Sequence, residues 1–202
     1  MSLLREIKIK TAPTVEPVTK AEAKAWIGLK TGYTDDDTLI EDTLIPGARS
    51  RAERYLNRSL LSQVRQYYYA SYLEHVYIPY GPVISVDSVK REELNVSTTL
   101  TENTDYYVQG LDDAFLVIAN PQTTLKAGQS PYDRFTSNEL LVECTCGYGT
   151  AATDVPDEIR EAILMMVSES YSERKGYIQG SIVAKFPNTA KAKLAPHRYI
   201  PM

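Results

Sequence analysis

Residues that bind metals or carry redox chemistry are scarce in this sequence. Its 202 residues include only two histidines, His75 and His197, and two cysteines, Cys144 and Cys146. Neither histidine stands at a spacing typical of a zinc motif, and one local pair of cysteines provides no disulfide framework. The sequence therefore predicts no metal site, no cofactor and synthesis in a reducing compartment.

An excess of positive charge and a long apolar run are missing as well. The formal net charge is −4 at pH 7 and the sequence pI is about 5.3, so we expect no basic surface that grips nucleic acid by releasing counterions. No run approaches the roughly 20 apolar residues of a membrane span, and the opening stretch MSLLREIKIK has no apolar core of the length that a signal peptide needs. We therefore expect neither export nor a membrane partner.

Tyrosine is abundant: the chain has 15, against three phenylalanines and one tryptophan. A ring with a polar hydroxyl suits half-buried surfaces such as subunit contacts. Tyrosine also favours β-strands. For any single tyrosine the strand interpretation is preferred, and subunit contacts remain open for the set.

Two helices are predicted within about residues 19–57, after an extended amino-terminal arm that reaches Val18. Thr19 and Glu22 match the capping-box pattern that begins a helix. Asp35 is expected to cap the second helix, because a short polar side chain there accepts a hydrogen bond from the first turn.

Pro46 and Gly47 interrupt the apolar periodicity of that second helix, which continues to Leu56. Proline removes a backbone donor and crowds the preceding turn. We therefore expect a kink or a broken helix at this point.

A β region is predicted over about residues 63–148, where Tyr, Val and Ile recur in short runs. Residues 111–113 are expected to form a hairpin turn between the runs DYYVQG and AFLVIA. Two polar stretches, 95–104 and 120–138, are interpreted as loops. The second is longer than most loops of compact domains and is expected to be functional or mobile, and to project from the body.

The clearest helix is predicted over about residues 155–175. Pro156 fits the first helical position, and Asp157 and Glu158 place negative charge where the helix dipole favours it. The remaining segment, 177–202, has no long periodicity apart from a short helical stretch NTAKAKLA. We interpret it as a tail that docks on another surface, such as a neighbouring subunit.

These elements predict an α+β fold in a single domain over residues 1–202. A small helical body, made of two amino-terminal helices and one long carboxy-terminal helix, contains an inserted antiparallel β region. An extended carboxy-terminal tail completes it.

Catalytic interpretations are weaker than structural ones throughout. Cys144 and Cys146 lie two apart in a predicted strand and so point to one face, which favours buried core residues over a reactive thiol without a neighbouring histidine. The GYGT stretch lacks the spacing of a phosphate-binding loop. The acids at 35–37 and 112–113 are explained by capping and turn chemistry.

Taken in order, several segments resemble the head–tail connector proteins of tailed bacteriophages and prophages, also called head completion or adaptor proteins. The resemblance covers about residues 15–198 and depends on the succession of segments rather than on any one of them. The segments are VEPVTKAEAKAWIGL, DDDTLIEDTLIPGARSRAERYLNRSLLSQ, IPYGPVISVDSV, DYYV, VECTCGYGTAATDVPDEIREAILMMVSESYSER and KLAPHR.

The resemblance implies a non-enzymatic structural subunit, made in the cytoplasm of the bacterial host and located in the virion neck. Such subunits form a homo-oligomeric ring on the portal vertex, twelve-fold to match a portal. The ring extends the DNA channel, through which DNA passes without sequence-specific binding, and offers a docking surface to the tail or neck protein. Carboxy-terminal tails are expected to engage the portal.

Within that tail, the candidate protein-interaction residues are Phe186, Leu194, Pro196, His197, Arg198 and Tyr199. Two other functions stay open. One is a tail-side neck or tail-completion protein with a different docking partner. The other is a small hydrolase, in which Asp35, Asp36 or Asp112 would converge with a second titratable group.

Overall fold

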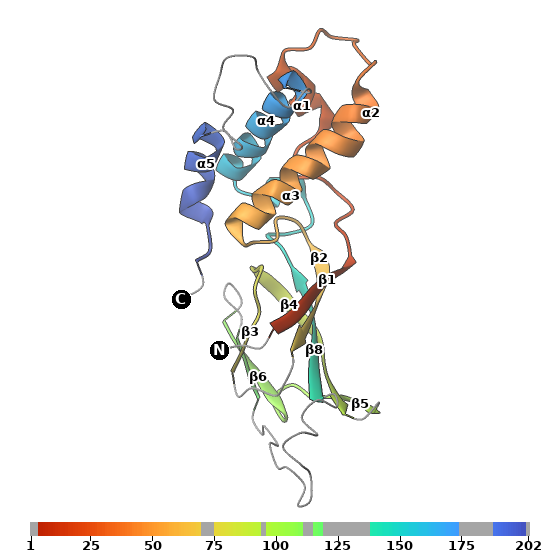
Figure 1. Cartoon of the computed structure of the whole chain (residues 1–202), viewed down its shortest axis with the longest axis vertical. Coiled ribbons are helices and arrows are strands. Elements are labelled where there is room, and N and C mark those ends of the chain that lie inside the picture. Colours follow the sequence, from red (N-terminus) through yellow and green to blue (C-terminus); the bar gives the residue numbers. More distant parts are fainter. Residues whose placement is uncertain are drawn as a thin grey trace, which may run out of the picture. The chain divides into compact units, whose positions relative to one another are not determined.

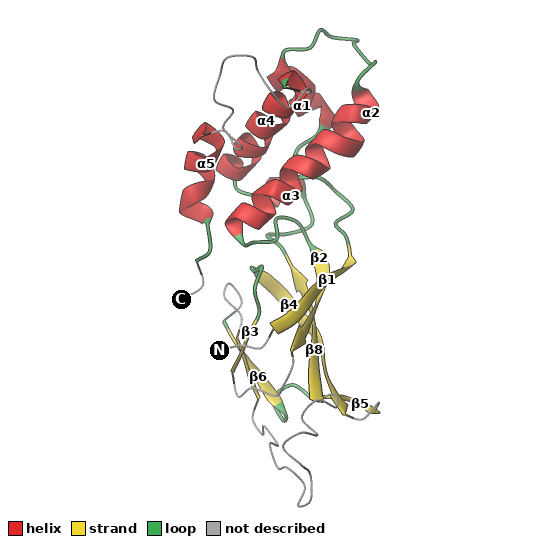
Figure 2. Cartoon of the chain, in the orientation of Figure 1, coloured by secondary structure: helices red, strands yellow, loops and turns green. Residues whose placement is uncertain are grey.

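The computed structural model of the chain describes residues 4–69, 75–93, 96–110, 115–118, 138–173 and 188–200. The chain divides into two compact units, which are drawn in Figures 1 and 2. We call Met1–Ala12 with Ser62–Gly147 the β unit, and Pro13–Leu61 with Tyr148–Met202 the helical unit. The α+β class and the insertion of the β region into the helical body are confirmed. The prediction of one domain over residues 1–202 stays a prediction. Each of the two units has its own core.

The β unit contains two antiparallel sheets. The first has the strand order β1-β2-β8-β4-β5 and the second has the order β3-β7-β6. The strands of the first sheet are β1 (Leu4–Thr11), β2 (Gln63–Tyr69), β4 (Val83–Glu93), β5 (Val96–Thr99) and β8 (Asn138–Cys146). Those of the second are β3 (His75–Tyr77), β6 (Tyr106–Gln109) and β7 (Phe115–Ile118).

The core of the β unit lies between these sheets. Strand β2 alternates buried and half-buried residues along its whole length, as a strand with one face in a core does. One buried cluster combines residues from both sheets, which shows that they pack face to face. It consists of Tyr67, Tyr69, Val76, Ile78, Val83, Val89, Tyr106, Leu140, Val142, Cys144 and Cys146.

Two strands lie where the sequence predicted none. Residues Leu4–Thr11, expected to be an extended arm, pair with β2 as an edge strand. Residues Val96–Thr99, expected to be part of a polar loop, pair with β4 at the opposite edge. All four residues of β5 are exposed, so this strand has no apolar alternation that a sequence pattern could reveal. The predicted hairpin turn at 111–113 and nearly all of the 120–138 loop lie outside the described residues.

The helical unit is built from α1 (Lys20–Ile27), α2 (Asp37–Leu39), a π-helical turn (Ile40–Leu44), α3 (Ile45–Leu56), α4 (Asp157–Ser172) and α5 (Asn188–Leu194). Short 3₁₀ turns stand before α4 (Ala152–Asp154) and after α5 (Ala195–His197). Its core is aliphatic: the largest fully buried side chains are Ile40, Ile45, Leu56, Leu60, Leu61, Ile159 and Ile163.

The predicted interruption at Pro46 takes the form of the π-helical turn. Pro46 has no N–H, and its ring would crowd the carbonyl four residues earlier. The turn before it widens, so that the Ile45 N–H donates to the Ile40 carbonyl, five residues back. Helical backbone therefore continues from Asp37 to Leu56 without a break.

One of the two predicted helix caps is confirmed and the other is wrong. The Thr19 hydroxyl accepts from the Glu22 N–H at 3.2 Å, while the Glu22 carboxylate accepts from the Thr19 N–H at 2.7 Å. The second helix has Asp36, not Asp35, at its N-cap, and no side-chain hydrogen bond caps it. The Asp36 carboxylate instead accepts from the hydroxyls of Tyr33 at 2.9 Å and Tyr171 at 2.5 Å. A tertiary contact thus replaces the local cap.

The junction from β8 to α4 depends on a close approach at Gly149. A β-carbon at this position would lie 2.1 Å from Oδ2 of Asp154. The same oxygen accepts from the Ala151 N–H at 2.8 Å and so fixes the turn. Pro156 is the N-cap of α4 rather than its first helical residue, one position from the prediction.

Candidate interaction site at the carboxy-terminal segment

The described part of the predicted tail, residues 188–200, folds onto the chain's own helical unit; we call it the arm. Ala190 and Leu194, four residues apart on one face of α5, are both fully buried in the aliphatic core. Their burial determines which side of α5 faces α4.

An ion pair and a histidine–carboxylate hydrogen bond flank this apolar contact. Lys193 Nζ lies 2.8 Å from Glu161 Oε2, and His197 Nε2 lies 2.8 Å from Glu158 Oε2. The two acids are three residues apart on α4 and therefore share a face. Because the later arm residue pairs with the earlier α4 residue, the arm runs antiparallel to α4. The helix face that receives the arm is acidic and the arm is basic.

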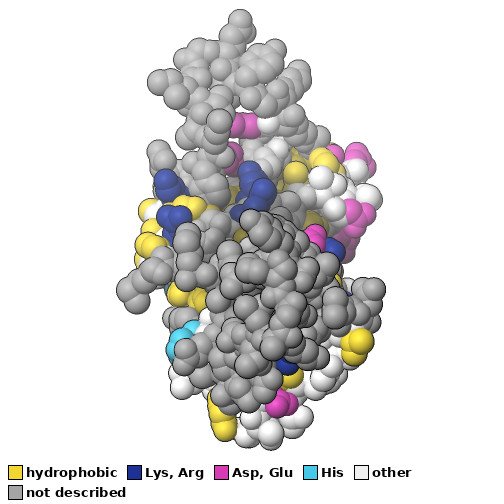
Figure 3. Space-filling model, turned by 60° about the horizontal axis from the view of Figure 1, so that its bottom comes forward, with side chains coloured by type: hydrophobic (Ala, Val, Ile, Leu, Met, Phe, Trp, Pro, Cys, Tyr) yellow, Lys and Arg dark blue, Asp and Glu magenta, His cyan; other side chains and the backbone are white. Residues whose placement is uncertain are grey.

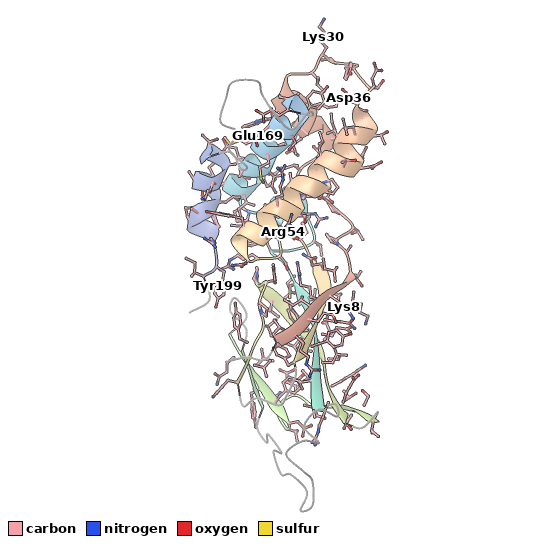
Figure 4. All side chains as sticks on the ribbon, viewed as in Figure 1. Lys8, Lys30, Asp36, Arg54, Glu169 and Tyr199 are labelled. Carbon is pink, nitrogen blue, oxygen red and sulfur yellow. The ribbon has the colours of Figure 1, made fainter. Side chains whose placement is uncertain are left out.

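The end of the arm is bound to the end of α3. The Tyr199 N–H donates to the Leu56 carbonyl at 2.8 Å, and the Asn57 amide donates to the Tyr199 carbonyl at 3.1 Å. The guanidinium of Arg58 stands 5.8 Å from the centre of the Tyr199 ring, within the range of a cation–π contact. Figure 4 shows Tyr199 below α5, near this end of α3.

The structure divides the six candidate tail residues into different environments. Leu194 lies inside the helical unit, so its side chain is not on the surface. Pro196 and Arg198 are exposed, whereas His197 and Tyr199 are half-buried. Phe186 lies outside the described residues. That these residues bind a partner protein stays a prediction.

Ile200 is a surface residue that the sequence analysis missed. Its side chain is 70% exposed, the largest value among the exposed large hydrophobic residues of the described chain. The sequence signal that could have identified it is an isoleucine between a tyrosine and a proline at the end of a polar tail. Other exposed apolar side chains, among them Ile9, Trp26 and Val96, are distributed over both units. On the face shown in Figure 3, hydrophobic side chains and charges of both signs are interspersed.

Among the acids proposed for a hydrolase, the described partners of Asp36 are tyrosines rather than a second titratable group of a catalytic pair. Asp36 accepts from two tyrosine hydroxyls, and its hydrogen bond raises the pKa of Tyr33 to about 12. Asp37 pairs with Lys24 at 2.6 Å, and this hydrogen bond lowers the pKa of Asp37. Asp35 is exposed, and Asp112 lies outside the described residues.

No metal site is present in the part of the chain that the structure describes, where no three His, Cys, Asp or Glu side chains converge on a common point. The two cysteines are free and fully buried, as the strand pattern predicted. Burial raises the pKa of the Cys144 thiol, which keeps it in the poorly nucleophilic protonated form. Cys144 and Cys146 therefore contribute to packing in the β unit.

None of the described helices has the length and apolar character needed to cross a membrane.

Comparison with known proteins gives solved structures of the same fold, among them the following three. The chain aligns with a chain in the neck of an empty gene transfer agent (GTA) particle computed with C6 symmetry, at 16% identity and a TM-score of 0.76. It aligns with a chain in the virion of a native gene transfer agent particle at 14% identity and a TM-score of 0.73. A chain in the neck of a native GTA particle computed with C12 symmetry gives 12% identity and a TM-score of 0.64.

Each alignment covers 98% of this chain and 97% of the other, so the likeness includes both units. No protein-family model matches the sequence. No curated protein matches it either. At these identities the likeness demonstrates a common fold.

Proposed function

We propose that the chain is a structural subunit of a phage or prophage neck, and specifically a head–tail connector. It assembles as a ring on the portal vertex, extends the DNA channel and offers the docking surface for the tail or neck. The observation that carries this proposal is the TM-score of 0.76 over 98% of this chain and 97% of a neck chain. A likeness over both units supports a shared role more strongly than a likeness of one common module.

Self-assembly into a ring follows from the same proposal. Two of the similar chains come from necks computed with C6 and C12 symmetry, which supports a cyclic homo-oligomer, twelve-fold to match a portal. A cyclic ring needs a heterologous contact, in which two different surfaces of one subunit meet on neighbouring copies. Exposed apolar residues on both units could be buried in such contacts.

The charge of the chain supports the proposal that the subunit surrounds DNA without binding it tightly. The net charge of −4 provides no general attraction for phosphates. Several surface cations are already paired with acids, such as Lys10 with Glu143 at 2.6 Å and Lys20 with Glu41 at 2.7 Å. DNA passing through the ring would therefore not be held by a general electrostatic attraction. The subunit acts by assembly, not by catalysis, and is located in the virion neck.

The portal contact is assigned to the exposed end of the arm, where Arg198 and Ile200 lie on the surface and the Arg198 guanidinium stands 5.1 Å from the centre of the Tyr55 ring. Purified protein is mixed with the portal protein and followed by co-sedimentation and negative-stain microscopy. We expect rings on the portal, and loss of association in the double variant Arg198→Glu/Ile200→Asp. Arg54→Glu, a charge change at an exposed position of α3, serves as the matched control.

Two outcomes would redirect the proposal. If the intact chain does not associate with the portal but binds the tail-tube end, the protein is a tail-side neck or tail-completion subunit. If it binds the portal and the double variant binds equally well, the arm is not the contact. Removal of residues 177–202 is a less informative variant, because it also removes the buried Ala190 and Leu194.

A further inference from the structure

The arm has a binding surface that the rest of the helical unit builds without it. An isolated helix of seven residues is too short to be stable in water, so α5 depends on docking for its conformation. Its partners Glu158 and Glu161 lie on the 16-residue helix α4, and Leu56 and Asn57 lie at the end of α3. The surface would therefore present the same groups to any arm of the same sequence.

The connection to the arm is longer than its present position requires. Fourteen residues, 174–187, separate the last described residue after α4 from the first residue of α5. The antiparallel arrangement needs a path of about 15 Å, from a helix separation of 8–10 Å and a short return along α4. A chain of this length can span about 50 Å. Most helix–helix connections have only 2–8 residues.

This reach matters in an assembly of identical subunits. A compact unit of about 100 residues has a radius of gyration of about 13 Å, so equivalent points on touching neighbours are about 30 Å apart. The connection of fourteen residues can cover that distance. A connection of eight residues spans at most about 30 Å when fully extended, so it would reach only as a fully extended chain.

We propose that in the assembled ring the arm of each subunit occupies the α3–α4 surface of a neighbouring copy. The proposal rests on the ring assembly proposed above. The basic arm and the acidic face of α4 supply charge complementarity for this occupant: Lys193 lies opposite Glu161, and the His197 ring pairs with Glu158 through a hydrogen bond. Exchange keeps every contact of the arm and makes each of them a contact between subunits.

Ring symmetry permits the exchange without any new interaction. The arm and its surface are two different patches of one subunit, so their mutual binding is a heterologous contact that repeats around a closed ring. Within the ring, the neighbouring surface is presented at the millimolar effective concentration typical of tethered partners. In the free subunit the same arm binds its own surface, as the structure has it.

Cysteine cross-linking in mixed rings tests this exchange. Lys193 and Glu161 are replaced in separate full-length chains, as K193C and E161C, at side chains that are 34% and 39% exposed. The native Cys144 and Cys146 are fully buried, so the unsubstituted chain reports background labelling. The two chains are mixed in equal amounts, assembled on the portal and treated with a short bismaleimide. One chain carries a size tag, so that a covalent pair of unlike chains is identified on a denaturing gel.

Exchange predicts that unlike chains are linked in rings, involving up to about half of the K193C chains when the two are placed at random. It also predicts that the double variant K193C/E161C gives linked multimers in rings and only internal links in dilute free protein. Rings that contain only internal links would overturn the proposal. The pair H197C and E158C repeats the test at the second contact.

The two proposals fail in distinguishable ways. Absence of rings, seen by light scattering and microscopy, removes the connector function and the exchange with it. Rings without links between chains remove the exchange alone. Mixtures of K193C chains alone, and of E161C chains alone, must stay unlinked if the cross-links report this contact.

Discussion

The β unit and the helical unit build their cores from different chemistry. The β unit buries Tyr67, Tyr69 and Tyr106 together with two thiols. The helical unit buries an aliphatic cluster, and its three core-packed tyrosines are only partly buried. The difference follows from geometry: a buried tyrosine needs an acceptor for its hydroxyl, and the β unit has free backbone carbonyls beside its sheets.

The hydroxyls of two of these tyrosines donate to backbone carbonyls. Tyr67 donates to the Pro79 carbonyl at 2.8 Å, and Tyr69 donates to the Tyr77 carbonyl at 2.6 Å. Each bond joins β2 of the first sheet to the segment that carries β3 of the second. Tyrosine therefore connects the two sheets, in addition to filling space between them.

Several polar groups in the helical unit act at its periphery, while the buried Glu53 carboxylate accepts from the Leu60 N–H at 3.0 Å. Arg160 on α4 donates to the Pro17 carbonyl at 3.0 Å and to Glu22 at 2.6 Å, and Arg49 on α3 donates to Glu16 at 2.7 Å. These contacts fix the segment before α1 against α3 and α4. Titration or removal of polar groups should therefore affect the two units differently.

The largest expected difference is the response to alkaline pH. Burial raises the pKa values of Cys144, Cys146, Tyr67 and Tyr69 in the β unit. A raised folded-state pKa gives stability that is complete below the unfolded-state pKa and is lost as pH rises above it. With an unfolded thiol pKa near 8.5, Cys144 alone costs about 2 kcal/mol at pH 10, and Cys146 adds to this loss.

Two probes separate the units in this experiment. Both cysteines lie in β8, so thiol protection relative to the unfolded chain reports the β unit, and the single tryptophan, Trp26 on α1, reports the helical unit by fluorescence. We expect thiol protection to fall between pH 8.5 and 10 while the urea midpoint seen by Trp26 changes less. Cys144→Ala should reduce the pH dependence seen through Cys146; an unchanged slope would contradict the assignment.

A pair of glycine substitutions gives the next largest effect, this time in the helical unit. Gly149→Ala would place a methyl group against the Asp154 carboxylate, which must move and release the Ala151 N–H. We expect a loss of about 1–2 kcal/mol in the free energy of unfolding. Gly47→Ala, on an exposed part of α3 with nothing within 4 Å, should instead stabilise by about 0.5–1 kcal/mol.

Urea denaturation followed by Trp26 fluorescence measures both variants. A gain in stability from Gly149→Ala, as at Gly47, would show that the contact with Asp154 does not constrain Gly149, which lies outside the helices. Thiol protection serves as the control, because neither glycine belongs to the β unit.

The sequence predicted those parts of the fold whose signal is local. The capping box at Thr19 and the apolar stripe of α4 were visible because neighbouring residues alone determine them. The strand β5 was not, because exposed edge residues pair through backbone atoms that every sequence shares. The predicted cap at Asp35 was wrong for a related reason: the N-cap residue is Asp36, and its partner Tyr171 is 135 positions away.

The candidate site was predicted in outline only. A docking tail with a short helix was expected, and α5 is where NTAKAKLA stands. That Leu194 points into the chain's own core depends on the acidic pattern of α4 and on the end of α3, which lie far away in sequence. Surface and core positions of a seven-residue amphipathic helix cannot be assigned until its partner face is known.

A pair of tyrosine substitutions tests the role of the hydroxyls in the β unit. Tyr67→Phe keeps the ring and leaves the Pro79 carbonyl without its donor, so we expect a loss of about 1.5 kcal/mol. Tyr68 lies on the opposite face of the same strand, and its hydroxyl donates to the Gln66 side chain at 3.3 Å. Tyr68→Phe should change the free energy of unfolding by much less. Thiol protection in urea measures both, and equal losses would remove the distinction between the faces.

The smallest expected effect concerns the periphery of the helical unit. The Thr19 N–H, the Thr19 hydroxyl and Arg160 all donate to Glu22, and the backbone hydrogen bond contributes most to lowering its pKa. A lowered folded-state pKa gives stability that is present above the ordinary carboxyl pKa and is lost as pH falls through the folded value. Glu22→Gln should therefore lower the Trp26-detected urea midpoint at pH 7 and leave it nearly unchanged at pH 3. Asp42→Asn, at an exposed acid of the same unit, is the matched control. If Glu22→Gln lowers the urea midpoint by the same amount at both pH values, Glu22 acts through packing rather than through its charge. In that case only the β unit would show a stability that depends on the titration of its side chains.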